Sequence, residues 1–380
     1  MMATVDSYYQ DYGSRARELK KQGRKIIGYL CAFTPVEIIS AAGFVPFRIK
    51  GDVNEPITKA DAEMETIVCP LVRSCFDMAL RGKYEFLDGI VIPHACDSIC
   101  RTYDIWKYTL NLPYSHFINM PHGADGPSLD FYKAELNTFR RSLSRFAGRE
   151  ISDQHLGEAI GLYNQNRARV RDLYELRKTT PPLISGTELA KLLVVAVSVP
   201  VSEATELIDG VTEEVKRRGS IPAAKSARLM VVGAQVDSIA FIDLIENSEA
   251  WVVADDLCPG AREFFSDITV TPDPMDGIAE RYLRGIYCSR TFRERTGSYD
   301  EYLEQRFGHI GRFVKDYKVD GVVLYIYKYC DPYGFDVPAM KSYIESAGTP
   351  VLYLEDEYSM STIGRLRTRI QAFLELLGLK

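Results

Sequence analysis

The sequence predicts an α/β protein built from two similar halves with parallel sheets, joined by a helical connector. Short apolar runs alternate with helix-like stretches in both the first and the last part of the 380-residue chain. The part between them, residues 128–225, contains no convincing strand and is rich in Leu, Arg, Glu and Ala at helical spacing. Continuous apolar runs are typical of parallel strands that helices cover on both faces.

The composition is that of an ordinary folded protein, with 46% hydrophobic and 26% charged residues. The net charge of −6 argues against a nucleic-acid-binding protein, which usually carries a basic stripe. No apolar run reaches the roughly 18 residues of a membrane span, and residues 1–9 lack the apolar run of a signal peptide. We therefore expect a cytoplasmic protein with no membrane and no nucleic-acid partner.

The first half is predicted to span residues 25–127, after an N-terminal helical cap at residues 1–24. Strands are expected at 25–31, 44–49, 88–93 and 112–119, and helices at 34–42, 69–80 and 98–109. In the first of these helices, Pro35 suits the first position and Glu37 the first turn, while Gly43 marks its end.

The second half is predicted to span residues 226–380. Its strands are expected at 228–233, 250–256, 320–326 and 350–355, before a final amphipathic helix. Asp88-Gly89 opens a strand that precedes Cys96-Asp97, and Asp320-Gly321 opens one that precedes Cys330-Asp331. In both places a helix, a proline and another strand follow, which indicates a weak internal repeat of about 230 residues.

Eight cysteines are the main chemical signal of this chain, since a cytosolic protein keeps its thiols reduced or uses them as ligands. Cys31, Cys96 and Cys330 follow predicted strands, at the edge of the sheet where α/β proteins bind ligands. Cys69, Cys96 and Cys330 also stand at helix starts, where the helix dipole favours a thiolate. Three thiolates that converge between two domains suit an iron–sulfur cluster.

A plainer interpretation stays open, because buried cysteines often serve as small apolar residues and these spacings match no compact ferredoxin or zinc-finger motif. Cys75, Cys100 and Cys288 lie in helix-like stretches and are expected to pack, while Cys258 in a loop has no assigned role. No glycine-rich nucleotide-binding loop is present, so direct nucleotide binding is not expected.

Three further residues are candidates for catalysis, each with a structural alternative. His94, close to Cys96, is a candidate proton donor or a hydrogen-bonded structural histidine. Glu37 is placed to reach a cleft between the domains, although its position at a helix start already explains it. Thr34 is a candidate contact for a substrate hydroxyl or a helix N-cap.

Several segments together resemble the 2-hydroxyacyl-CoA dehydratase and benzoyl-CoA reductase family. They are Gly28–Ile39, Ala42–Pro46, Cys69–Ser74, Cys96–Ser98, Val253–Cys258 and Tyr329–Pro332. The similarity runs from about residue 25 to the C-terminus. It implies two flavodoxin-like domains with a 4Fe–4S cluster between them, held by Cys69, Cys96 and Cys330. The fourth iron would be left to a non-protein or substrate ligand, with Cys31 ranked as a neighbour of the site.

The resemblance also implies a radical enzyme that works with partners. These are a related second subunit, which completes a heterodimer, and a separate ATP-hydrolysing iron–sulfur activator. The substrate would be an acyl-CoA, whose thioester carbonyl accepts an electron to give a ketyl radical. A dehydratase then expels the 2-hydroxyl, whereas a benzoyl-CoA reductase reduces the aromatic ring.

Two other functions remain open at this stage. One is a homodimeric relative with a larger cluster that reduces small molecules. The other is a redox-inactive binding protein whose two domains close around a ligand.

Overall fold

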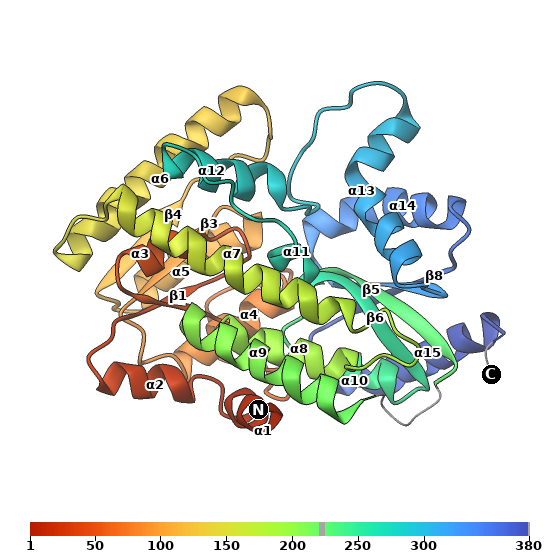
Figure 1. Ribbon diagram of the computed structural model, residues 1–380. Helices are drawn as coiled ribbons and strands as arrows, with labels where there is room; N and C mark the ends of the chain where they lie inside the picture. The colour runs from red at the N-terminus through yellow and green to blue at the C-terminus, as the bar shows by residue number, and fades with distance from the viewer. Residues whose placement is uncertain (220–224, 379–380) are drawn as a thin grey trace.

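The computed structural model describes residues 1–219 and 225–378 and confirms the predicted α/β class. It contains two four-stranded parallel sheets with the strand orders β2-β1-β3-β4 and β6-β5-β7-β8. Figure 1 shows the sheets in different parts of the molecule, with the long helix α7 crossing in front of both. The two orders are equivalent, because in each half the first strand lies between the second and the third. This is the strand order of flavodoxin-like domains.

The first half has the elements that its sequence predicts, with small shifts at their ends. Its strands are β1 (Ile26–Tyr29), β2 (Val45–Arg48), β3 (Gly89–Pro93) and β4 (Tyr114–Ile118). Its helices are α3 (Val36–Ala41), η1 (Ala60–Ala62), α4 (Pro70–Leu80) and α5 (Asp97–Thr109). Pro35 is the N-cap of α3 rather than its first residue, and Gly43 follows the helix with a φ of 84°.

The segment predicted as a helical connector contains four helices and no strand within its described residues. They are α6 (Gly126–Ala147), α7 (Asp153–Glu175), α8 (Gly186–Ala196) and α9 (Val201–Arg218). The N-terminal segment forms α1 (Met2–Gln10) and α2 (Ser14–Lys21), and α1 packs against α8. Nowhere in residues 1–219 or 225–378 is there a helix long and apolar enough to cross a membrane.

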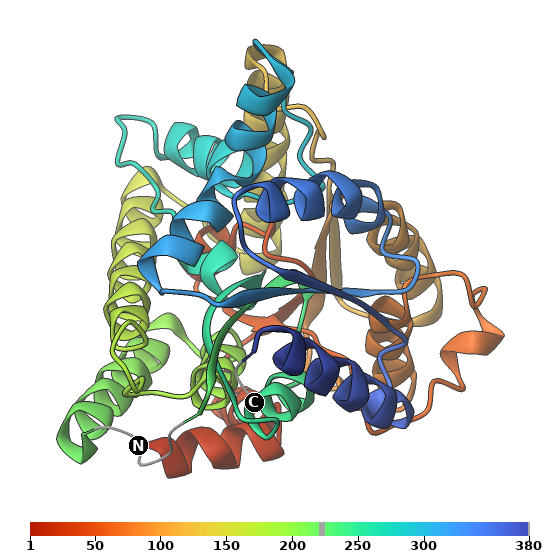
Figure 2. The ribbon, with the colours of Figure 1, turned by 90° about the vertical axis from the view of Figure 1, so that its right-hand side faces the viewer.

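The second half repeats the sheet and adds helices that the sequence did not predict. Its strands are β5 (Ala227–Gln235), β6 (Ala250–Cys258), β7 (Gly321–Tyr327) and β8 (Val351–Asp356). Its helices are α10 (Ala240–Glu246), α11 (Ala261–Phe264), α12 (Pro274–Glu280), η2 (Arg281–Gly285), α13 (Tyr299–Asp316), α14 (Asp331–Ser346), η3 (Met360–Thr362) and α15 (Ile363–Leu376). Figure 2 shows β7 and β8 between α14 and α15.

The chain of the second half reaches back into the first. Ile268, Met275 and Ile278 pack in one buried cluster with Ile27 of β1 and Phe44. Helix α12 also contacts α6 and α7. The core of the first half is therefore completed by residues that follow β6 in the sequence.

The repeated Asp-Gly pair has the same structural role in both halves. Asp88 accepts a hydrogen bond from the amide of Ile26 at 2.9 Å, and Asp320 accepts one from the amide of Arg228 at 2.7 Å. Each carboxylate thus ties the start of the third strand to the start of the first. A Cβ on Gly89 would lie 2.6 Å from the Tyr114 carbonyl oxygen, so the neighbouring strand requires glycine there.

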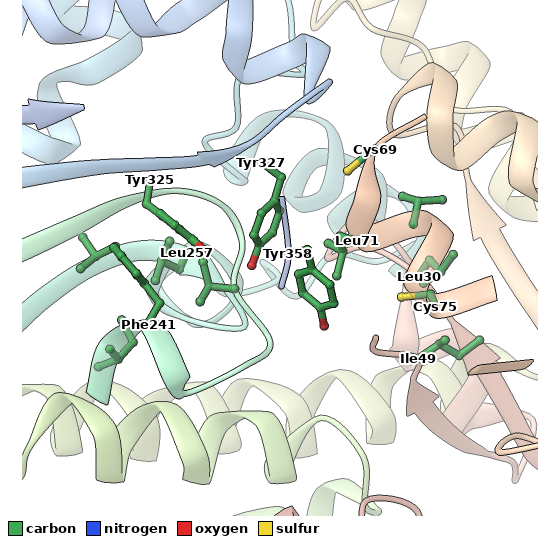
Figure 3. Packing of buried hydrophobic residues seen from close by; sticks show 14 of the residues in the cluster. Leu30, Ile49, Cys69, Leu71, Cys75, Phe241, Leu257, Tyr325, Tyr327 and Tyr358 are labelled. Carbon is green, nitrogen blue, oxygen red and sulfur yellow. The ribbon is translucent and has the colours of Figure 1, made fainter. Parts of the chain in front are cut away.

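The two halves share one apolar core where they meet. Figure 3 shows Cys69 and Leu71 from the first half near Tyr327 and Tyr358 from the second. Asp237 adds a polar link, since it accepts hydrogen bonds from the amide of Gly51 at 3.2 Å and the hydroxyl of Tyr358 at 2.7 Å. This contact holds the carboxyl ends of the two sheets in a fixed relation.

Candidate functional site

A cavity between the two halves gathers most of the cysteines of the chain. Its empty space, including the opening to solvent, is about 620 Å³. Six of the eight cysteines line it: Cys31, Cys69, Cys96, Cys258, Cys288 and Cys330. The three cysteines that the sequence singled out therefore lie together, with Cys31 beside them.

Three of these thiols stand at the start of a helix, as the sequence predicts. Cys69 is the N-cap of α4, Cys96 of α5 and Cys330 of α14. Cys96 and Cys330 follow β3 and β7, the corresponding strands of the two halves. The repeat therefore brings two equivalent positions to one cavity.

The other three cysteines reach the cavity from positions that are not helix starts. Cys31 follows β1 with a φ of 69°, a left-handed conformation that costs a non-glycine residue about 1–2 kcal/mol. Cys258 is the last residue of β6, and Cys288 follows the π-helical turn η2.

Sequence reasoning left Cys258 unassigned and expected Cys288 to pack within a helix, but both line the cavity. The position of Cys258 close to the end of a predicted strand is the sequence signal that could have located it. Of the remaining two cysteines, Cys75 is buried in the core shared by the halves, and Cys100 is partly exposed on α5. Neither lines the cavity.

Burial dominates the acidity of the cavity thiols. It raises the pKa of Cys69 to about 11 and that of Cys258 to about 12, and it raises the pKa of Cys96 and Cys330 as well. The amides of Leu71 and Val72 act in the opposite direction on the pKa of Cys69 but do not overcome desolvation. The helix start therefore favours the thiolate of Cys69, as expected, but burial has the larger effect on its pKa. A metal that binds here must displace protons.

Three arginines bring positive charge to the same cavity: Arg48, Arg262 and Arg290. Arg48 is 1% exposed and donates to Gln235 at 2.7 Å, and its Nη1 lies 3.5 Å from Glu263. Arg262 lies 3.5 Å from the sulfur of Cys258. Within the described chain, Nε and Nη1 of Arg48 and Nε of Arg290 have no hydrogen-bond partner. Buried donors without partners are costly, so this wall of the cavity suits an anionic occupant.

The donor set fits an iron–sulfur cluster. Thiolates are the ligands of such clusters, and a thiolate-bound cluster is anionic, which matches the unpaired arginine donors. In residues 1–219 and 225–378, no three His, Cys, Asp or Glu side chains lie close enough to hold one metal ion. A single zinc would require every sulfur ligand to lie about 2.3 Å from the metal. Sulfurs spread around a cavity suit a larger multi-iron group.

The three other predicted site residues do not line this cavity. Thr34 is buried and donates to the Leu30 carbonyl at 2.9 Å, and it is not the N-cap of α3. Glu37 is fully buried, forms an ion pair with Arg167 of α7 and accepts a hydrogen bond from Tyr282 at 2.7 Å.

His94 is the neighbour in sequence of Ala95, which lines the cavity. It is half-buried two residues before Cys96, and its ring packs edge-to-face on His122 with centroids 5.1 Å apart. The His94 carbonyl accepts a hydrogen bond from Arg290 at 3.0 Å, so its backbone helps to position a cavity arginine.

Comparison with known proteins decides the family. Residues 31–377 match the family described as 2-hydroxyglutaryl-CoA dehydratase, D-component. The chain belongs to this family. The (R)-phenyllactyl-CoA dehydratase beta subunit of Clostridium sporogenes is 27% identical over 99% of this chain and 100% of that protein. A putative dehydratase subunit, YjiM, of Escherichia coli is 28% identical over 95% of this chain and 93% of that protein.

A benzoyl-CoA reductase subunit of Thauera aromatica is 26% identical over 96% of this chain and 95% of its own length. The family thus includes both dehydratase and reductase subunits, as the sequence resemblance implied. The chain is accordingly an enzyme subunit, of a lyase or of an oxidoreductase.

Proposed function

We propose that the cysteine cavity holds an iron–sulfur cluster and that the chain is the cluster-bearing subunit of a radical 2-hydroxyacyl-CoA dehydratase. The observation that carries this proposal is the convergence of Cys69, Cys96 and Cys330 on one cavity from both halves of the fold. A 4Fe–4S cluster on these three thiols keeps one iron free of protein ligands, as the family resemblance implies.

The residues of the cavity divide into ligands, counter-charges and an apolar wall. Cys69, Cys96 and Cys330 would hold the group, while Arg48 and Arg290 stabilise its negative charge from buried positions. The apolar lining includes Leu71 and Val72 and limits water at the site. When bound, the cluster supplies single electrons at low potential and Lewis-acid assistance to a substrate oxygen.

We also propose that the protein works as part of an electron-transfer assembly in the cytoplasm. The phenyllactyl-CoA dehydratase and benzoyl-CoA reductase relatives are both named as subunits and are therefore parts of larger enzymes. A related second subunit would complete a heterodimer with this chain, and a separate ATP-hydrolysing iron–sulfur activator would deliver the electrons. Nucleotide binding by a separate activator agrees with the lack of a glycine-rich nucleotide loop in this sequence.

The test uses the complex purified without oxygen together with its partner subunit. The reduced complex is incubated with a 2-hydroxyacyl-CoA, and the products are followed by mass spectrometry. The proposal predicts an enoyl-CoA lighter by one water, and no product from the matching acyl-CoA without the hydroxyl. An iron-loaded, reduced complex that leaves every 2-hydroxyacyl-CoA in a broad panel unchanged would contradict the dehydratase assignment.

Benzoyl-CoA reduction is a second candidate, favoured by the similarity to the benzoyl-CoA reductase subunit of Thauera aromatica. The same reduced complex is offered benzoyl-CoA. A product heavier by two hydrogens, without turnover of 2-hydroxyacyl-CoA, would select this reaction.

The six thiols of the cavity favour a third candidate, a homodimeric reductase of small molecules with a larger cluster. Three thiols suffice for one 4Fe–4S cluster with an open iron, so Cys31, Cys258 and Cys288 are available for more iron. Iron analysis separates the candidates, with about four iron atoms per chain for one 4Fe–4S cluster and more than four for a larger cluster. The oligomeric state gives an independent answer, because this candidate needs no second type of subunit.

A further inference from the structure

A smaller pocket lies beside the cysteine cavity and shares Cys288 and Tyr333 with it. Its empty space, with the opening to solvent, is about 310 Å³. Helices α13 and α14 form two of its walls, and the loop that follows η2 forms the third. Most of its lining is polar or charged, which distinguishes it from the mainly apolar and thiol-lined cavity next to it.

Two buried polar atoms of this pocket have no hydrogen-bond partner in the part of the chain that the structure describes. One is the hydroxyl of Thr291, a residue that is only 1% exposed. The other is Nδ1 of His309, whose Nε2 lies 3.2 Å from Oδ2 of Asp256. Because a carboxylate accepts hydrogen bonds, Nε2 carries a hydrogen, and Nδ1 is left free to form one hydrogen bond with a ligand.

Two carboxylates and two arginines line the pocket: Asp256, Asp336, Arg293 and Arg306. Asp336 pairs with Arg306, whereas Asp256 pairs at 3.0 Å with Arg262, which is not part of this lining. Arg293 stacks over the Tyr287 ring at 4.7 Å and donates to the Arg284 carbonyl at 2.7 Å.

No carboxylate among residues 1–219 and 225–378 forms an ion pair with Arg293. Burial lowers the pKa of Arg293, and Arg306 and Arg284 act in the same direction. Since a guanidinium keeps its proton, an anionic ligand would relieve this uncompensated charge.

We propose that this pocket binds a small hydroxycarboxylate, whose carboxylate accepts from Arg293 and Thr291 and whose hydroxyl forms a hydrogen bond with Nδ1 of His309. The single negative charge of the ligand matches the guanidinium of Arg293, which has no carboxylate partner. The two oxygens of a carboxylate also match the two parallel N–H donors of a guanidinium. A doubly charged oxyanion suits the pocket less well, since Asp256 and Asp336 lie in the same lining. The shared wall places this ligand directly beside the thiols, and the proposal holds whether or not a cluster is present.

The test measures lactate binding to the purified full chain by saturation-transfer difference NMR, with propionate as the matched acid that lacks the hydroxyl. Lactate is expected to bind several-fold more tightly than propionate, since only lactate has the hydroxyl that forms the additional hydrogen bond. Phosphate is expected not to displace lactate at equal concentration. Equal affinity for lactate and propionate, displacement by phosphate, or no lactate binding would each overturn the proposal.

Two variants test whether lactate binds in this pocket. Thr291→Val and Arg293→Gln are expected to weaken lactate binding at least fivefold, while Arg312→Gln, an exposed residue of the same helix as His309, leaves it unchanged. Thr291→Val is expected to keep or raise the melting temperature, because it removes a buried hydroxyl without a partner. Unaltered lactate binding in both pocket variants would place the ligand elsewhere and overturn the proposal.

Discussion

Glu37 shows how strongly the role of one residue depends on distant parts of the chain. Its ion-pair partner Arg167 is 130 residues away and its hydrogen-bond donor Tyr282 is 245 residues away. Arg167 lowers the pKa of the Glu37 carboxyl against the opposing effect of burial. The residue thus joins α3 to α7 and η2, and we do not retain it in the proposed catalytic set.

Replacement of Glu37 by glutamine should therefore harm stability rather than chemistry. Loss of one partner from a buried ion pair leaves an uncompensated charge and costs about 3–5 kcal/mol. We expect Glu37→Gln to lower the free energy of unfolding by that amount in denaturant titrations at pH 7. The Glu37→Leu/Arg167→Met double variant should recover much of the loss. A fully stable Glu37→Gln protein that has lost activity would instead support a catalytic role.

The buried thiols predict a loss of stability at high pH in the metal-free protein. The pKa of Cys69 is raised from 9.0 to about 11, so the folded state favours the protonated thiol. This contribution is complete below pH 9 and is lost as the pH rises through about 11, since the unfolded chain ionises first. Its full size is on the order of 3 kcal/mol.

The measurement compares denaturant unfolding of the wild type and Cys69→Ser between pH 8 and 11, with chelator and reductant present. We expect the stability of the wild type to fall more steeply than that of the variant. Parallel curves would show that the Cys69 thiol does not resist ionisation in the folded state.

At the residue scale, the sequence located Cys69, Cys96 and Cys330 because a strand end or a helix start is a local pattern. Cys288 was not located, since its position depends on η2 and on a loop that only the complete fold brings to the cavity. The direction of the thiol pKa shifts was also not predictable, because burial is a tertiary property.

At the scale of elements, the repeated Asp-Gly pairs offer a direct test of the internal repeat. Asp88 and Asp320 accept equivalent amide hydrogen bonds, so Asp88→Ala and Asp320→Ala should each cost about 1–3 kcal/mol of stability. Asp88→Ala should cost slightly more, since Asp88 also pairs with Lys20 at 2.5 Å.

Thermal or chemical unfolding of the two variants checks this expectation, with Asp130→Ala at an exposed position as the control. A large loss in one half and none in the other would contradict equivalent roles.

The eight strands were predictable because buried parallel strands are continuous apolar runs with clear ends. Helices α10 to α13 were missed. Of these, α11 and α12 are short, and α12 packs on α6 and α7 of the helical connector. The sequence of α12 itself does not show which distant helices it will contact.

At the scale of the whole molecule, the duplicated fold explains why the site lies where it does. Ligands of such sheets bind at the carboxyl ends of strands, and here the carboxyl ends of two sheets face one cavity. Contacts such as Asp237 with Gly51 and Tyr358 hold the halves together around it. A cluster between the halves would therefore be held by ligands from both.

The most direct test of this account is the iron and acid-labile sulfide content of protein purified without oxygen. The wild type and Cys100→Ser are expected to contain at least about four iron atoms per chain. Cys100 is the matched control because it lies on α5 outside the cavity, whereas Cys96 begins the same helix and lines the cavity. Cys96→Ser is expected to lose most of the iron. A wild-type protein without iron, or a Cys96→Ser variant with its full complement, would contradict the account.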